Sequence, residues 1–189
     1  EEDVFIKPFQ LPAYFPRGYG LDVGWKCTAA IWGAWDRDND IIYAYSEHYR
    51  GQAEPAVHAA AIKARGSWIK GAIDPASRGR SQLDGKKLID QYEANGLKLE
   101  MAHNAVESGL LEVYQRLSTG RLKIFSTLEK IKSEYRIYRR NEKGFIVKEN
   151  DHALDALRYL CMTFNEIASL PPVKKTNTHR PIADSTVGY

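Results

Sequence analysis

YGLDVGWKCTAAIWGAWDRDNDIIYAYSEHY, residues 19–49, contains three runs rich in β-branched and aromatic residues, at 19–26, 28–35 and 41–49. The polar stretch DRDND supplies a turn between the second run and the third. Because such short connections join antiparallel neighbours, this stretch predicts three antiparallel strands of one sheet.

After this stretch, helical patterns alternate with short strands. Pro55 suits the first turn of a helix, and Gly66 suits its end. The other expected elements are strands at 68–74, 97–102 and 121–125, helices at 86–96, 106–118, 126–134 and 151–168, and a hairpin at 135–148. Three antiparallel strands followed by crossover helices predict a mixed α/β sheet with helices on both faces, in which the first strand lies beside the fourth.

The length of 189 residues favours one domain with a lead-in and a tail. We expect a proline-containing lead-in or linker at 1–17, the domain at 18–168 and a flexible polar tail at 169–189. The chain begins with Glu1, which suggests a domain excised from a longer protein. Cys27 and Cys161 are far apart, which argues for a reducing compartment and against a thiolate zinc site. There is no secretory signal and no apolar run of about 18 residues, so no membrane association is expected.

Several acids are predicted to converge at one end of the sheet. Asp22 interrupts the first strand and Asp74 closes the fourth, so parallel pairing of these strands would bring the two carboxylates together. In the last helix, Asp151 and Asp155 are rotated by only about 40° from one another, and His152 by about 60° from Asp155. This helix could place Asp155 against the strand acids.

Three partly buried carboxylates need compensation, since two charges about 5 Å apart repel by about 3 kcal/mol at an effective dielectric near 20. Either the acids protonate or a cation holds them. Oxygen ligands suit Mg²⁺ or Mn²⁺, and two such ions can activate a water and stabilise the leaving oxygen of a phosphodiester. His152 is close enough to Asp155 to assist a water or the scissile phosphate.

Structural explanations compete for most of these residues. Asp74 precedes Pro75 and could begin a turn, and Asp151 could stabilise the helix N-terminus. His152 alone could be a surface or capping residue. Asp155 is the hardest to explain structurally, because it lies past the first turn of a largely apolar helix.

Basic residues lie close to these acids in the sequence and are candidates for binding a phosphate backbone. The alternative for each is ordinary solvated surface charge. One group follows Asp74 directly and the other surrounds the expected hairpin: Arg78, Arg80, Lys86 and Lys87, and Arg136, Arg139, Arg140 and Lys143.

The motifs GLDVGW, AIDPAS and ENDHALDALRY resemble the C-terminal nuclease domain of the large terminase subunit of tailed bacteriophages, over roughly residues 12–161. The resemblance implies an RNase H-like fold and metal-dependent, largely sequence-nonspecific cleavage of double-stranded DNA during genome packaging. On it, Asp22, Asp74 and Asp155 match the metal-binding acids, with His152 and Asp151 in auxiliary roles. Either Asp151 or Asp155 could be the principal ligand from the last helix, and we favour Asp155 because Asp151 also suits the helix start.

The resemblance further implies an N-terminal packaging ATPase in the same polypeptide, portal and small terminase subunits as partners, and action in the host cell cytoplasm. The chain has no G-x-x-x-x-G-K-[ST] phosphate loop, so the motor is not expected here. The tail after Leu170 could engage the portal.

Other functions share some of these features. An actin-like phosphotransferase also begins with a hairpin and a D-x-G strand, but it needs a second domain. A junction resolvase or transposase would use the same carboxylates. A non-catalytic DNA- or portal-docking module would use only the basic loops.

Overall fold

The computed structural model of the chain describes residues 3–78, 87–137 and 151–173. The strands are β1 (Phe5–Ile6), β2 (Arg17–Asp22), β3 (Thr28–Asp36), β4 (Ile41–Arg50), β5 (Gly71–Ile73), β6 (Leu99–Met101) and β7 (Leu122–Phe125). The helices are α1 (Pro55–Lys63), α2 (Leu88–Ala94), α3 (Val106–Ser118), α4 (Glu129–Ile137) and α5 (His152–Ile167), with a 3₁₀ turn at Pro75–Arg78. None of these helices combines the length and hydrophobicity needed to cross a membrane.

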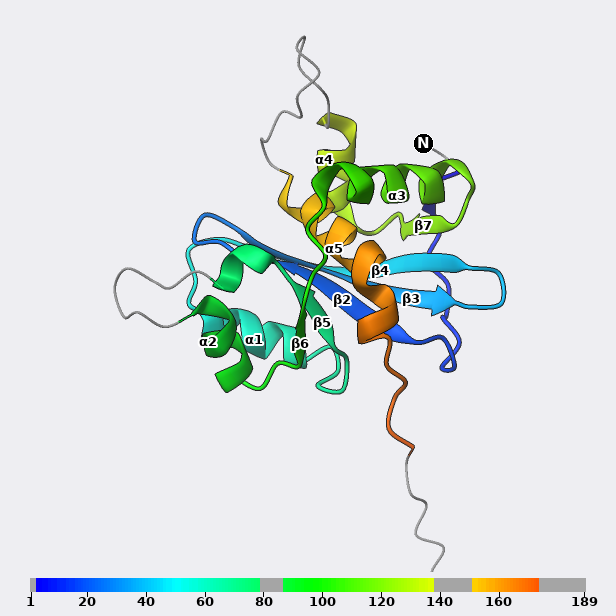
Figure 1. Cartoon of the computed structure of the whole chain (residues 1–189). Helices are drawn as coiled ribbons and strands as arrows, with labels where there is room; N and C mark the ends of the chain where they lie inside the picture. The colour runs from blue at the N-terminus through cyan, green and yellow to red at the C-terminus, as the bar shows by residue number, and fades with distance from the viewer. Residues whose placement is uncertain (1–2, 79–86, 138–150, 174–189) are drawn as a thin grey trace, which may run out of the picture.

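The strands form one mixed sheet in the order β1-β7-β4-β3-β2-β5-β6 (Figure 1). β3 is antiparallel to β2 and β4, whereas every other neighbouring pair is parallel. The predicted pairing of the first strand with the fourth is confirmed, because β2 and β5 lie side by side with Leu21 opposite Ile73. β2 ends at Asp22 rather than at residue 26, because the chain turns there and the Thr28 hydroxyl bonds to both the N–H and the C=O of Gly24.

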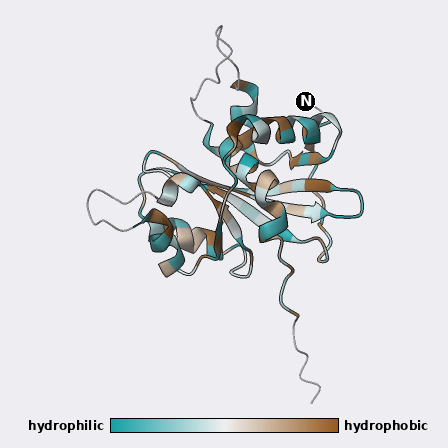
Figure 2. Ribbon diagram, viewed as in Figure 1, coloured by the Kyte–Doolittle hydropathy of each residue, from teal (hydrophilic) through white to brown (hydrophobic). Residues whose placement is uncertain are grey.

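Helices cover both faces of the sheet, as predicted. α1 and α2 pack on one face over Tyr19, Leu21 and Trp32, while α3, α4 and α5 pack on the other. Hydrophobic and hydrophilic residues alternate along α3, which turns one side to the core (Figure 2). Tyr114 of this helix is 68% exposed, although it is in helical phase with the apolar residues Leu110 and Leu117.

α5 lies directly against β2. Side chains alternate across a strand, so Tyr19 and Leu21 face α1 and α2 while Gly18, Gly20 and Asp22 face α5. A Cβ atom at Gly20 would overlap the backbone carbonyl oxygen of Ala156. The absence of a side chain at this position therefore lets the helix backbone approach the strand, just beside Asp22.

Two other predicted regions need comment. The hairpin expected at 135–148 is wrong at its start, because residues 135–137 are the last turn of α4. The apolar spacing of Leu128 and Ile131 continues through this turn and overrides the local β preference of tyrosine and isoleucine. Residues 138–148 lie outside the described part of the chain.

The expected lead-in, 1–17, contributes to the sheet. β1 pairs in parallel with β7, and Arg17 at the start of β2 pairs with Ser169 just beyond α5. The backbone bonds between Arg17 and Ser169 measure 2.8 and 2.9 Å. The start of the expected tail is therefore attached to β2, whereas residues 174–189 lie outside the described chain.

Candidate active site

Adjacent strand ends place Asp22 and Asp74 at the same edge of the sheet. Asp22 is the last residue of β2, and Asp74 directly follows β5. The Asp74 N–H donates to the Leu21 carbonyl oxygen at 2.9 Å, so the two strands stay paired up to the acids. The two carboxylates are therefore neighbours, and each makes the electrostatic potential at the other more negative.

Asp22 forms a direct pair with His152, the first residue of α5. His152 Nδ1 lies 2.8 Å from Asp22 Oδ2, and the residue Asp22 is 8% exposed. Burial raises the pKa of Asp22, the bond and charge of His152 lower it, and the charges of Asp155 and Asp74 raise it further. The hydrogen bond to Asp22 raises the pKa of His152, although burial opposes this shift. His152 and Asp22 thus form a hydrogen-bonded pair beside Asp74.

Asp74 accepts two hydrogen bonds through Oδ1. The Ala76 N–H donates at 2.9 Å, which is the predicted turn-starting role, and the Tyr159 hydroxyl of α5 donates at 3.2 Å. Burial raises the pKa of Tyr159, and the charges of Asp74, Asp155 and Asp22 raise it further. Tyr159 therefore stays protonated as a donor to Asp74.

Asp155 is paired with Arg158 one turn further along α5. Arg158 Nη2 lies 2.8 Å and Nε 3.2 Å from Asp155 Oδ1, and the Arg158 side chain is only 4% exposed. Arg158 Nη1 is buried without a hydrogen-bond partner among the described residues. Asp155 thus faces both the acids at the strand ends and an arginine with unused donor capacity.

Asp151 stands at the N-cap position of α5 but makes no side-chain capping bond. Its charge contributes to the raised pKa of His152. The side chain that accepts the first N–H groups of α5 is Glu134 of α4, whose Oε2 accepts the N–H groups of Ala153 at 2.8 Å and Leu154 at 3.0 Å. Glu134 was not predicted from the sequence. The available signal was an acidic residue three positions after Ile131, on the apolar side of an amphipathic helix.

The residues at this edge suit a hard divalent cation in their chemistry, since all three acids offer oxygen ligands. Among the described residues, no three His, Cys, Asp or Glu side chains are already close enough together to form a ligand cluster. Each acid is instead held by a donor from α5. To bind an ion, Asp155 would have to give up its bond to Arg158. Asp22 would have to bind the ion while it keeps its bond to His152.

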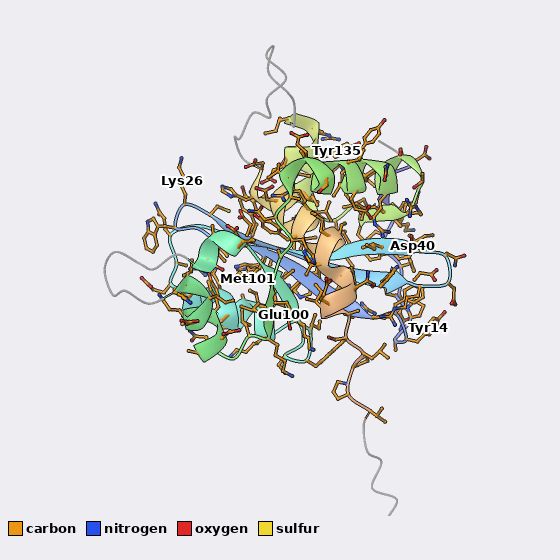
Figure 3. All side chains as sticks on the ribbon, in the orientation of Figure 1. Tyr14, Lys26, Asp40, Glu100, Met101 and Tyr135 are labelled. Atoms are coloured by element: carbon orange, nitrogen blue, oxygen red, sulfur yellow. The ribbon has the colours of Figure 1, made fainter. Side chains whose placement is uncertain are left out.

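Few of the predicted DNA-binding residues can be placed. Lys87 is exposed directly before α2, and the backbone of Arg78 closes the 3₁₀ turn that follows Asp74. Arg80, Lys86, Arg139 and Arg140 lie outside the described residues. In the loop after Asp22, Trp25 is 64% exposed and Lys26 points away from the ribbon (Figure 3).

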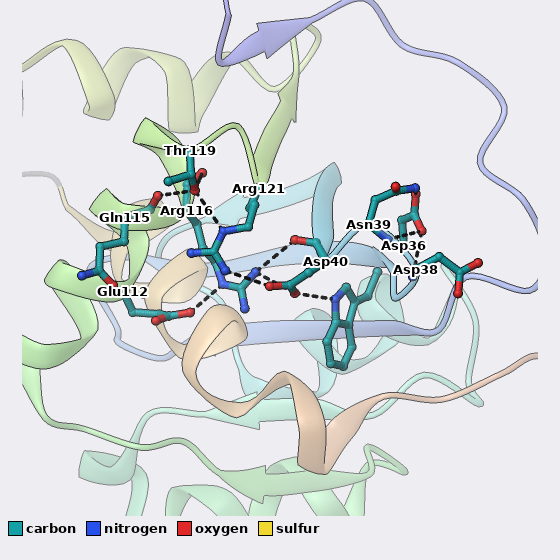
Figure 4. Close-up of polar contacts among 10 residues, drawn as sticks. Asp36, Asp38, Asn39, Asp40, Glu112, Gln115, Arg116, Thr119 and Arg121 are labelled. Atoms are coloured by element: carbon teal, nitrogen blue, oxygen red, sulfur yellow. Dashed lines mark hydrogen bonds and ion pairs between the residues drawn. The ribbon is translucent and has the colours of Figure 1, made fainter.

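A second polar cluster lies at the other end of β3 and is structural. Asp40 accepts bonds from Arg116, Arg121 and the Trp35 indole, which tie the β3–β4 turn to α3 and to the start of β7 (Figure 4). Burial raises the pKa of Asp40, but the Arg121 and Arg116 bonds outweigh it, so the pKa is lowered. These bonds give Asp40 a structural role in holding the β3–β4 turn.

Comparisons with known proteins agree with this architecture. The sequence profile of the Terminase RNaseH-like domain matches residues 20–164. The large terminase subunit of Salmonella phage P22 is 34% identical over 170 residues, which cover 84% of this chain and 34% of that relative. The chain therefore spans about a third of the length of this relative.

Solved structures give the same result. The P22 large terminase nuclease domain superposes with a TM-score of 0.80 at 31% identity, covering 89% of this chain and 90% of that one. The large terminase nuclease domain of bacteriophage SPP1, solved with bound Mn, matches with a TM-score of 0.61 at 18% identity over 82% of this chain and 89% of that one. The predicted RNase H-like fold is confirmed, and the chain belongs to the terminase RNase H-like nuclease domain family.

Proposed function

We propose that this domain is a divalent-metal-dependent endonuclease that hydrolyses double-stranded DNA during viral genome packaging. The observation that carries the proposal is the placement of Asp22 and Asp74 at the ends of the paired strands β2 and β5, with Asp155 of α5 near enough for its charge to act on Asp22. Acids that lie close together repel one another, and a divalent cation bound between them would relieve that repulsion. The Mn-bound nuclease domain of SPP1 supports the choice of Mg²⁺ or Mn²⁺.

The roles of the residues follow from their positions. Asp22, Asp74 and Asp155 would hold the ions, with Asp151 as a further ligand from the start of α5. When bound, two Mg²⁺ or Mn²⁺ ions would lower the pKa of a water and stabilise the leaving oxygen. His152 binds Asp22 through Nδ1, which leaves Nε2 to exchange a proton with a water or with the scissile phosphate. Exposed Lys87, with Arg78, Arg80, Lys86, Arg139 and Arg140, would bind the phosphate backbone.

The partners follow from the family. We infer that the domain acts in the host cell cytoplasm as part of a large terminase subunit, joined to a packaging ATPase domain and working with the portal and the small terminase subunit. The P22 relative, of which the matched region covers only 34%, supports a longer parent protein.

Plasmid cleavage with Mg²⁺ or Mn²⁺ tests the proposal. The variants are Asp22→Asn, Asp74→Asn, Asp151→Asn and Asp155→Asn, and the matched control is Asp40→Asn at the other end of the sheet. Loss of a residue that only supports a metal ligand costs 10–100-fold, so loss of a ligand should cost roughly 10²-fold or more. Circular dichroism would establish that each variant is folded.

The outcomes separate the rival functions. Metal-dependent nicking that disappears in the variants at 22, 74 and 155, but not at 40, supports the nuclease and identifies the third ligand. Cleavage restricted to four-way junctions would indicate a resolvase. DNA binding that survives all four substitutions, without cleavage by the wild type, would favour a docking module.

A further inference from the structure

The start of α5 is held by a side chain from another helix. A helix leaves its first N–H groups without partners, and the residue before it commonly accepts one of them. Asp151 makes no such bond, whereas Glu134 Oε2 accepts the N–H groups of both Ala153 and Leu154, at 2.8 and 3.0 Å. α4 therefore supplies the cap that the local sequence of α5 does not.

This cap acts at the point of α5 that carries the active-site side chains. Ala153 and Leu154 lie between His152, which binds Asp22, and Asp155, which binds Arg158. The two bonds to Glu134 Oε2 fix the backbone of Ala153 and Leu154, and so the position of the residues on either side. A shift of this turn would move the imidazole away from Asp22 and the carboxylate away from the strand acids at the same time.

The burial of Glu134 indicates that its position is specific. The residue is only 3% exposed, and its Oε1 atom has no hydrogen-bond partner among the described residues. A buried carboxylate is unfavourable unless its bonds compensate for the loss of water. An apolar residue here would continue the packing of Ile131 but would leave two buried N–H groups without an acceptor.

We propose that Glu134 is a positioning residue of the nuclease site, which sets the first turn of α5 so that His152 and Asp155 meet the acids of β2 and β5. The inference rests on the proposed function for its catalytic consequence. Its structural part, the acceptor oxygen at Ala153 and Leu154, stands on geometry alone. What α5 needs is the oxygen, so glutamine should replace glutamate in this role.

The experiment compares Glu134→Met, which keeps the volume and removes the acceptor, with Glu134→Gln, which keeps it. Glu129→Met, at an exposed position of the same helix, is the matched control. Cleavage is measured against Mn²⁺ concentration. We expect Glu134→Met to lose at least about 10-fold in maximal rate and to need about 10-fold more Mn²⁺, as removal of a supporting partner does. Glu134→Gln and Glu129→Met should stay within about 3-fold of wild type.

A second readout does not depend on cleavage. In the wild type, the amides of Ala153 and Leu154 should be protected from hydrogen exchange, although amides at a helix start normally exchange fast. The ring ¹⁵N signals of His152 should shift in Glu134→Met and stay in place in Glu134→Gln. Unprotected amides in the wild type, or equal effects of methionine and glutamine, would overturn the inference. If the wild type cleaves no DNA, the proposed function fails, and amide protection still tests the capping.

Discussion

Gly20→Ala is the sharpest test of how close α5 lies to the acids. The new Cβ would overlap the Ala156 carbonyl oxygen and lie 2.8 Å from the Leu160 nitrogen. Both are backbone atoms, which cannot rotate away, so the helix must recede by more than about 1 Å to reach ordinary contact distance. Overpacking of this kind costs about 3 kcal/mol, which corresponds to a fall in Tm of about 6–12 °C for a chain of this size.

The same shift should impair catalysis, since a misplacement of about 1 Å can lower a rate about 10²-fold. Gly18→Ala is the matched control on the same strand and face, because its Cβ would meet the Ile167 Cδ1 atom at 2.9 Å, and that side chain can rotate. Differential scanning calorimetry and plasmid cleavage on both variants measure the difference. A wild-type Tm and rate for Gly20→Ala, or equal losses for both variants, would refute the close backbone contact.

Three further predictions concern other parts of the chain. Burial raises the pKa of Glu134 to about 7, although the N–H groups of Leu154 and Ala153 and the side chain of Tyr49 oppose this shift. Between pH 4.5 and 7, the native state therefore keeps a proton that the carboxyl group of the unfolded chain has lost. The free energy of unfolding should therefore fall as the pH rises through this range. In urea unfolding, Glu134→Gln should be as stable as wild type at pH 4 and about 3 kcal/mol more stable at pH 8, and parallel pH curves for the two proteins would contradict this. Lys87→Gln should reduce the slope of log affinity against log salt by about 1 in DNA-binding titrations, whereas Lys123→Gln, whose ammonium binds the Asp3 carbonyl, should leave it unchanged. Asp40→Asn should cost at most about 1 kcal/mol, because Asp40 and Arg121 are partly exposed, and should leave plasmid cleavage at the wild-type rate.

The sequence was sufficient to predict the sheet and the meeting of two acids. The alternation of β2 and the order of strands and helices place β2 beside β5, and the carboxyl ends of parallel neighbours meet at one edge. Asp22 and Asp74 follow from that rule alone. The α5 side chains that bind these two acids cannot be predicted in this way, because their positions depend on how α5 is rotated and how closely it approaches β2. Contacts of Gly18 and Gly20 with α5, which is distant in the sequence, determine that approach.

Local patterns misled at two points. Residues 135–137 have a β-rich composition, yet the apolar spacing from Leu128 carries α4 through them. Asp151 has the sequence of a helix start, yet Glu134 accepts the N–H groups instead. In both places a tertiary contact outweighed a local preference worth less than about 1 kcal/mol.

α5 supplies a donor to each of the three acids, so the geometry of the site follows the placement of one helix. His152 binds Asp22, Tyr159 binds Asp74, and Arg158 binds Asp155. The strands fix where Asp22 and Asp74 are, and α5 fixes which way they face and brings the third acid. Gly20 sets the distance between helix and strand, and Glu134 sets the first turn, so substitutions at either position act on all three acids together. Their effects on cleavage should therefore be less than additive in the double variant, because each alone already displaces the same helix.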